Sequence, residues 1–271
     1  MAGGFAWYWR FLHRLPTEFA TPVDEALAGG RTDRFIEGWG GGSHITRTPS
    51  SLSTARPGAA WNWGIARALF RLWGYQPGEL WALTYGWGGG CVDPNGVETR
   101  DDSVDENLAD LDGFVNAVLA YVQQRDPSIQ QVDIVGHSMG GVLARKWMQA
   151  GNAGRVRRLV TLDSPHHGIA GWWLREDRCA DGWTRFCQDF EIGSPWLAAL
   201  NQKPEIPPGV RALAVYDGTG QYSFNATPLS PALEGADNLA YNRERGARVR
   251  HIAYVYDPGV LREVFEWLSK E

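Results

Sequence analysis

Short apolar runs alternate with segments of helical periodicity along most of this 271-residue chain. Runs typical of buried strands stand at 80–85, 131–135, 157–162, 210–216 and 249–256. Apolar residues keep helical spacing over 104–122, 139–150 and 258–268. This alternation predicts the α/β class, with a mostly parallel central sheet and helices on both of its faces.

The whole chain, 1–271, is expected to form a single domain, because its length fits one large domain and shows no internal duplication. Residues 163–208 interrupt the alternation with Gly, Pro, Trp and charged residues. They lack the apolar content of a separate core, so we interpret them as a Trp- and Gly-rich loop excursion over one edge of the sheet.

Charge and hydropathy exclude two classes of partner. The formal net charge of −5 offers no basic excess for coating nucleic-acid phosphates. The chain has no run of 18 apolar residues, which argues against a transmembrane segment. The oligomeric state stays open.

The most specific motif is Gly136-His137-Ser138-Met139-Gly140, which directly follows the strand at 131–135 and directly precedes a helix. A nucleophile on a tight strand-to-helix turn requires small residues two positions before and two positions after it. The start of the helix also directs backbone N–H groups, including that of Met139, toward an oxyanion. The motif therefore predicts a nucleophile elbow with Ser138 as the nucleophile.

Four stretches resemble the α/β-hydrolase superfamily, in particular bacterial, actinobacterial-type triacylglycerol lipases and esterases. They are GHSMGGVLARKWM at 136–148, TLDSPHHG at 161–168, CQDFEIGSPWLAALN at 187–201 and VRHIAYVYDP at 249–258. Extracellular polyester depolymerases are similar as well. The resemblance spans most of residues 33–268 and implies the α/β-hydrolase fold and a serine ester hydrolase without a cofactor. The excursion at 163–208 would then cover the active-site edge.

The catalytic base is expected late in the chain, because the order in this fold is serine, acid, histidine. His251 is the one histidine after residue 167. In the lipases that the chain resembles, the segment before Tyr-Asp-Pro holds the catalytic imidazole, and 249–258 matches it. If His251 is the base, the last strand lies nearer 238–241 and the segment 249–256 is partly loop.

Asp217 is the predicted triad acid, because it directly follows the strand at 210–216. The lipases usually carry the aspartate about four residues beyond the tyrosine, where this chain has Gly220. Three alternatives stay open: Asp217 acts from a shifted loop, another carboxylate such as Glu234 or Asp237 replaces it, or the triad is incomplete.

The second oxyanion donor is predicted to be the backbone N–H of Trp39. Relatives carry a His-Gly pair where this chain has Glu37-Gly38-Trp39. Since the donor is a backbone group, Glu37 need not abolish activity, but its carboxylate should turn away or pair, for example with Arg34, Arg47 or a histidine.

Tryptophan and glycine are enriched, with 14 and 33 residues, and Gly-Trp-Gly-Gly-Gly occurs at 38–42 and again at 86–90. The carboxyl ends of parallel strands share the face on which Ser138 must lie. We therefore expect about half of the tryptophans to line or border the site. The candidates for this role are Trp39, Trp61, Trp63, Trp87, Trp172 and Trp173.

Cys179 and Cys187 are expected to form a disulfide in an oxidising compartment, and two reduced thiols are the alternative. Secretion, with a signal peptide removed, is the expected localisation, while a cytoplasmic location stays open. No Cys/His spacing indicates a metal. Adjacent residues in an extended chain point opposite ways, so His166 and His167 rarely share a metal. The resemblance implies that His166 or His167 shapes the loop.

The sequence thus predicts hydrolysis of carboxylic esters with apolar acyl groups by a triad of Ser138, His251 and Asp217. Three alternatives remain. One is a polyhydroxyalkanoate-type polyester depolymerase. Another is a non-catalytic binding protein of the same fold, which the departures at Glu37 and Gly220 motivate. The third is acyl transfer to an alcohol in a drier site.

Overall fold

A computed structural model describes residues 38–42, 44–54, 60–83, 104–170, 188–202, 204–223 and 225–270. The strands of these residues form one seven-stranded sheet in the order β1-β3-β2-β4-β5-β6-β7. All neighbouring pairs are parallel except β1 with β3. The strands are β1 (Gly38–Trp39), β2 (Ser50–Thr54), β3 (Leu80–Leu83), β4 (Val132–His137), β5 (Val156–Leu162), β6 (Arg211–Tyr216) and β7 (Asp237–Ala240).

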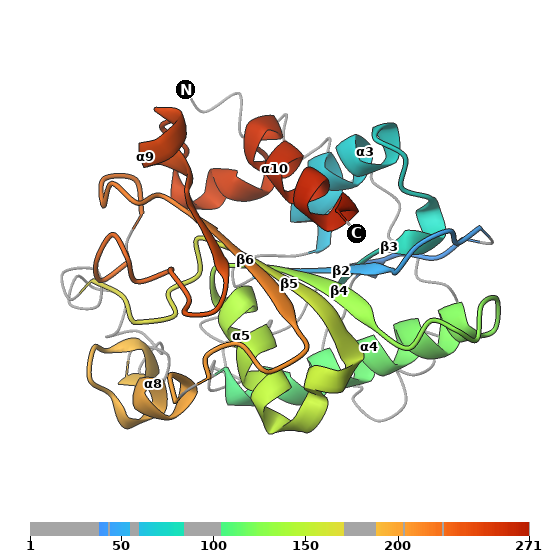
Figure 1. Cartoon of the computed structure of the whole chain (residues 1–271), viewed down its shortest axis with the longest axis horizontal. Coiled ribbons are helices and arrows are strands. Elements are labelled where there is room, and N and C mark those ends of the chain that lie inside the picture. Colours follow the sequence, from blue (N-terminus) through green and yellow to red (C-terminus); the bar gives the residue numbers. More distant parts are fainter. Residues whose placement is uncertain are drawn as a thin grey trace, which may run out of the picture.

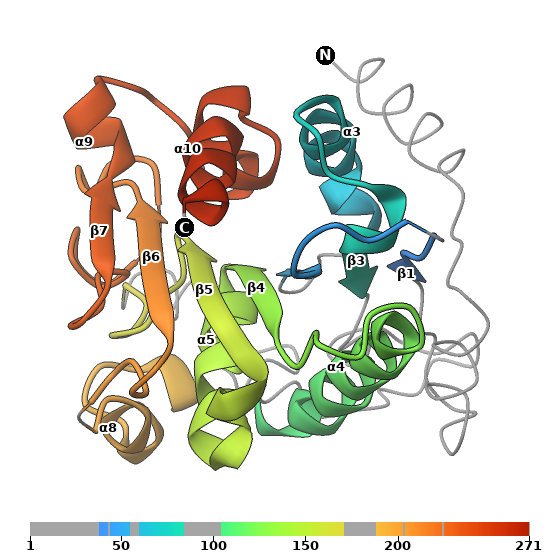
Figure 2. The same ribbon diagram turned by 45° about the vertical axis from the view of Figure 1, so that its right-hand side comes forward.

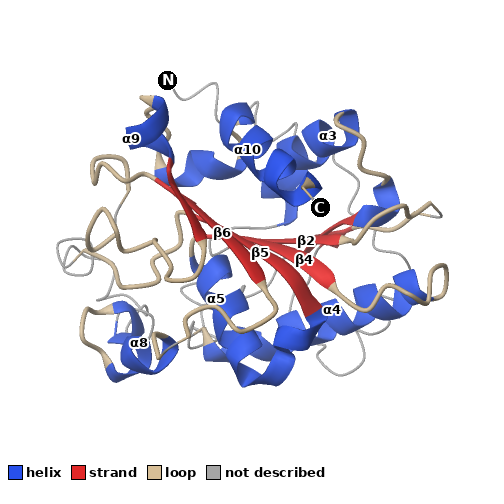
Figure 3. Cartoon of the chain, in the orientation of Figure 1, coloured by secondary structure: helices blue, strands red, loops and turns tan. Residues whose placement is uncertain are grey.

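Helices lie on both faces of the sheet (Figure 1; Figure 3). One face carries α3 (Gly64–Leu72), α9 (Tyr241–Arg245) and α10 (Pro258–Ser269). The other face carries α4 (Leu108–Gln123), α5 (Met139–Trp147) and α8 (Pro195–Leu200). Short helical turns lie at Ala60–Trp63, Pro77–Glu79, Asp105–Asn107, Met148–Asn152, Ala153–Arg155 and His251–Val255.

Two hydrophobic clusters, one on each face of the sheet, hold these layers together. On the face of α4 and α5 the cluster includes Phe114 and Trp147, and on the face of α3 and α10 it includes Phe70 and Val264. Figure 2 shows α10 above β5 and β6, with α5 and α8 below them. This is the three-layer arrangement that the alternating pattern predicts, and it confirms the predicted fold class.

The strands predicted at 131–135, 157–162 and 210–216 are confirmed as β4, β5 and β6. The predicted last helix is confirmed as α10, and Asp257 caps it. The Oδ1 atom of Asp257 accepts the backbone N–H groups of Gly259 and Val260, each at 2.9 Å.

The strand predicted at 249–256 is wrong. The chain forms a 3₁₀ turn over His251–Val255 instead, and the last strand is β7 at Asp237–Ala240. His251, Tyr254 and Val255 are the buried residues of the turn, and this spacing suits a helix and not a strand. The position of β7 agrees with the alternative that a loop-borne His251 requires.

The central strand β2 escapes a search for apolar runs, because its sequence is Ser-Ser-Leu-Ser-Thr. It lies between β3 and β4, and Ser50 and Ser51 are fully buried. The Ser50 hydroxyl donates to the Tyr75 hydroxyl over 3.4 Å. Small side chains fit where helices cover both faces, so burial here does not require a hydrophobic sequence.

No helix in the described ranges is long and apolar enough to cross a bilayer. The predicted disulfide partners Cys179 and Cys187 lie outside the described residues, and so do Glu37, Trp87, Trp172 and Trp173.

Candidate active site

Ser138 stands alone between the last residue of β4 and the first residue of α5. Its backbone has φ 56° and ψ −129°, a conformation that non-glycine residues rarely adopt. The Ser138 N–H donates to the carbonyl of Leu162 at 2.9 Å, which ties the turn to the end of β5. Within the described ranges, Ser138 and Asp163 are the two non-glycine residues with positive φ. Such strain is concentrated at functional sites.

Gly136 has to be a glycine for the elbow to close. A Cβ atom there would lie 2.5 Å from the Gly141 nitrogen and 2.7 Å from the Gly140 carbonyl carbon. A Cβ on Gly141 would collide with the Ser164 hydroxyl. The structure thus gives the physical reason for the small residues around Ser138.

His251 faces a carboxylate. Its Nδ1 atom lies 2.6 Å from Oδ2 of Asp163, and both side chains are buried. An ionised carboxylate only accepts hydrogen bonds, so Nδ1 carries the proton and donates. The backbone N–H of His251 donates to the carbonyl of Tyr222 at 3.1 Å, which fixes the start of the 3₁₀ turn.

Asp163 is the first residue after β5 and has φ 46°. Its N–H donates to the carbonyl of Val215 at 2.8 Å, so its backbone is hydrogen-bonded to β6. Because β5 neighbours β4 and parallel strands end on one side, Asp163 lies at the same sheet edge as Ser138. The three residues keep the chain order serine, acid, histidine.

The predicted pairing of His251 with Asp217 is not made. The Asp217 carboxylate accepts instead from Thr219 Oγ1 and Asn242 Nδ2, both at 2.7 Å, and from the N–H groups of Gln221 and Tyr222. Burial alone would raise the pKa of Asp217, but these hydrogen bonds outweigh it and lower the pKa below its usual value.

Of the two other carboxylates that were alternatives for the acid, Asp237 accepts from the indole N–H of Trp267 at 2.8 Å. Glu234 is exposed, and its backbone N–H donates to Glu205 at 2.8 Å. Sequence reasoning missed Asp163, although the signal was present. Asp163 directly follows a buried strand, as Asp217 does, and its strand is the neighbour of the strand that leads to Ser138.

His137, the residue before Ser138, packs against His251 with ring centroids 4.7 Å apart. Its Nε2–H donates to the backbone carbonyl of His251 at 2.8 Å. The pKa of His137 falls from its usual 6.5 to about 3. Burial is the main cause, and the neighbouring His251 lowers the pKa further. His137 is therefore a neutral donor that holds the backbone of His251.

Trp39 does not lie where an oxyanion donor is needed. It belongs to β1, which β3 and β2 separate from β4, a distance of three strand spacings of about 4.8 Å each. Its side chain is buried and its indole N–H donates to the Ala60 carbonyl at 2.7 Å. This position supports core packing and not the predicted oxyanion and rim roles. The strand beside β4 is β2, and residues 55–59 after it lie outside the described residues.

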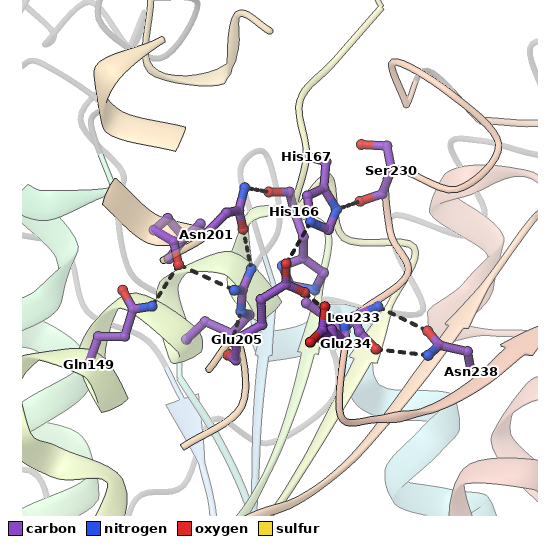
Figure 4. A network of polar contacts seen from close by, with 11 residues as sticks. Gln149, His166, His167, Asn201, Glu205, Ser230, Leu233, Glu234 and Asn238 are labelled. Atoms are coloured by element: carbon purple, nitrogen blue, oxygen red, sulfur yellow. Dashed lines mark hydrogen bonds and ion pairs between the residues drawn. The ribbon is translucent and has the colours of Figure 1, made fainter. Parts of the chain in front are cut away.

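The loop after Asp163 is held by a polar network (Figure 4). The His166 carbonyl accepts from Asn201 Nδ2 at 2.9 Å. His167 lies between the Ser230 carbonyl, 2.8 Å from Nδ1, and Oε1 of Glu205, 3.2 Å from Nε2. His167 thus contacts this part of the loop through its side chain, and His166 through its backbone carbonyl.

A buried cation lies beneath this loop. Arg145 is fully buried and donates to the Asn201 side chain and to the carbonyls of Leu200 and Glu205. The pKa of His166 lies well below its usual value. Burial is the main cause, and the positive charge of Arg145 lowers the pKa further. No three potential metal ligands gather anywhere in the described part of the chain.

The comparisons agree with this fold. A family model described as a PGAP1-like alpha/beta domain matches residues 101–171. No curated protein matches the chain. Solved structures match at low identity, and they include lipase B of Aspergillus fumigatus (12% identity, TM-score 0.57, 83% of this chain and 52% of that one). This chain therefore spans about half the length of that lipase.

Two further matches cover nearly the whole of the other protein. Lipase BlEst2 of Bacillus licheniformis is 16% identical, with a TM-score of 0.53 over 86% of this chain and 97% of that one. An esterase of Thermogutta terrifontis is 14% identical, with a TM-score of 0.51 over 86% of this chain and 92% of that one. The chain has the α/β-hydrolase fold.

The depressed pKa of His137 predicts a loss of stability in acid. The unfolded chain binds this proton near pH 6.5 and the folded chain near pH 3. Between these values the unfolded state holds more protons, so the free energy of unfolding falls as the pH falls, by up to about 1.4 kcal/mol per pH unit for one histidine. The lowered pKa of His166 decreases the free energy of unfolding in acid in the same way.

Denaturant unfolding of wild type and His137→Gln between pH 7 and pH 3.5 checks this. The variant should lose less stability per pH unit than wild type, by up to one histidine's contribution. His44→Gln, at an exposed histidine, is the matched control for the substitution. A His137→Gln slope equal to the wild-type slope would contradict the account.

Proposed function

We propose that this chain is a serine hydrolase that cleaves carboxylic esters with apolar acyl groups. Ser138 is the nucleophile, His251 the general base and Asp163 the acid that orients it. One observation carries the proposal: the buried His251–Asp163 pair, 2.6 Å apart, at the same sheet edge as a serine on a strained strand-to-helix turn. Asp163 takes the place that the sequence alone assigned to Asp217.

The first half of the reaction forms an acyl-enzyme. The Ser138 hydroxyl attacks the ester carbonyl carbon while Nε2 of His251 takes its proton. Asp163 stabilises the resulting imidazolium through its bond to Nδ1. The N–H of Met139, at the start of α5, donates to the oxyanion of the tetrahedral intermediate. The intermediate collapses, and the alcohol leaves with the proton from His251.

The second half regenerates the enzyme. Water attacks the acyl carbonyl as His251 takes one of its protons, and Ser138 leaves with that proton to release the acid. Each half thus returns the histidine to its neutral state. The pair needs no cofactor to balance these steps.

Two observations support an ester with an apolar acyl part. Ile252 directly follows the histidine and is 63% exposed, and Ile192 is 62% exposed. Ile192 lies against the loop that leaves Asp163, since a Cβ on Gly168 would be 3.2 Å from it. Solved proteins of similar fold are named as lipases and an esterase, which supports the same reaction class here.

Replacing the nucleophile tests the proposal. Ser138→Ala should lower kcat for p-nitrophenyl butyrate and octanoate by at least about 10³-fold, because the attacking oxygen is lost. A fluorophosphonate probe should label wild type and not the variant. Ser128→Ala, at an exposed serine on the turn after α4, is the matched control and should keep wild-type rates. Full activity in Ser138→Ala would contradict the proposal.

Two asparagine variants test the choice of acid. Asp163→Asn should lower kcat by about 10³- to 10⁴-fold, since an amide cannot hold the reactive histidine tautomer or its imidazolium. Asp217→Asn should lower kcat by no more than about tenfold and lower the Tm, because the amide loses hydrogen bonds inside its loop.

The two rate constants, measured on folded protein of each variant, decide between the carboxylates. If Asp217→Asn lowers kcat as much as Asp163→Asn does, with unchanged circular dichroism, the triad acid is Asp217 and the choice of Asp163 is wrong.

A further inference from the structure

The second oxygen of the buried acid is also occupied. Oδ1 of Asp163 accepts from the side-chain amide of Asn225 at 2.9 Å, while Oδ2 accepts from His251. We propose that Asn225 is a positioning residue for the triad, which holds the Asp163 carboxylate turned toward the histidine. This inference rests on the proposed function.

The amide of Asn225 is oriented by its own contacts. Nδ2 donates to Asp163 and, at 2.5 Å, to the hydroxyl oxygen of Ser223, which uses both amide hydrogens. Within the described ranges the Oδ1 atom of Asn225 has no partner. The reverse orientation would set two acceptors, the amide oxygen and the Asp163 carboxylate, against each other, so the donor must face the acid.

The backbone of Asn225 is held independently of its side chain. Asn225 forms an antiparallel bridge with Ile169, and the N–H of Ala226 donates to the Gly168 carbonyl at 3.0 Å. Ile169 belongs to the same loop that leaves Asp163. Removing the side chain should therefore leave this backbone pairing in place and delete the contact with the acid alone.

The loop that leads to Asn225 is organised by Asp217. Its carboxylate accepts the N–H groups of Gln221 and Tyr222 at 3.0 and 3.1 Å. Tyr222 in turn accepts the backbone N–H of His251. The loop thus contacts His251 through Tyr222 and Asp163 through Asn225, which explains an aspartate that follows β6 without contacting the histidine.

An amide suits this place better than a carboxylate would. Asp163 is fully buried, and a buried carboxylate is stable as an ion only when donors satisfy it. Asn225 donates without adding charge, and its amide does not ionise at ordinary pH. A second carboxylate at this position would set a like charge against Asp163 in place of a donor.

Steady-state kinetics of two variants across pH test the proposal. Asn225→Ala should lower kcat about 10- to 100-fold with little change in KM, because a hydrogen bond to a charged group is lost. Asn225→Asp, nearly identical in shape, should move the acid limb of the kcat/KM profile to higher pH. Asn116→Ala, at an exposed asparagine of α4, is the matched control.

The outcomes separate this inference from the function on which it rests. Wild-type kcat in Asn225→Ala, or a wild-type pH profile in Asn225→Asp, would overturn the positioning role while an inactive Ser138→Ala keeps the function. If Asn225→Ala does not fold, the pH profile of the isosteric Asn225→Asp decides. Full activity of Ser138→Ala would instead remove the proposed function itself.

Discussion

The candidate site depends on a buried carboxylate. Asp163 has no exposure to solvent, and a carboxylate in such a place must be paired or lose its charge. It is paired on both oxygens, by His251 on one side and Asn225 on the other. A buried carboxylate that loses a hydrogen-bond donor carries the cost of its desolvation, so each of these elements is tied to the others.

That constraint explains why distant segments converge. Asp163 follows the end of β5, the loop after β6 contributes Asn225, and the 3₁₀ turn after β7 contributes His251. His137, from the end of β4, holds the backbone of His251 from the opposite side. The strand-to-helix turn at Ser138 joins the same assembly through the hydrogen bond from the Ser138 N–H to the carbonyl of Leu162, the residue before Asp163.

The sequence predicted the architecture and, within the candidate site, the strand-to-helix turn at Ser138. Alternating periodicity was sufficient for β4, β5, β6 and α10, because helices on both faces leave these strands apolar. The glycines around Ser138 predicted the elbow, since their steric requirement is local. β2 was missed because burial between covered faces accepts serine, and the strand at 249–256 was wrong because a 3₁₀ turn can bury similar apolar residues.

The acid and the oxyanion residue depend on sheet order, which a linear pattern does not contain. Asp163 and Asp217 both follow buried strands, and only the hydrogen bonds of the folded chain tell a triad partner from a loop organiser. The prediction for Trp39 was wrong for the same reason. Trp39 belongs to the edge strand β1, whereas the strand beside β4 is β2.

The central claim, that Asp163 holds Nδ1 of His251, can be tested by proton NMR of protein with ¹⁵N-labelled histidine. A short hydrogen bond to a carboxylate moves the Nδ1 proton of His251 to low field and slows its exchange with water. We expect this resonance in wild type and in Asp217→Asn, and its loss in Asp163→Asn. Its loss in Asp217→Asn and survival in Asp163→Asn would contradict the account.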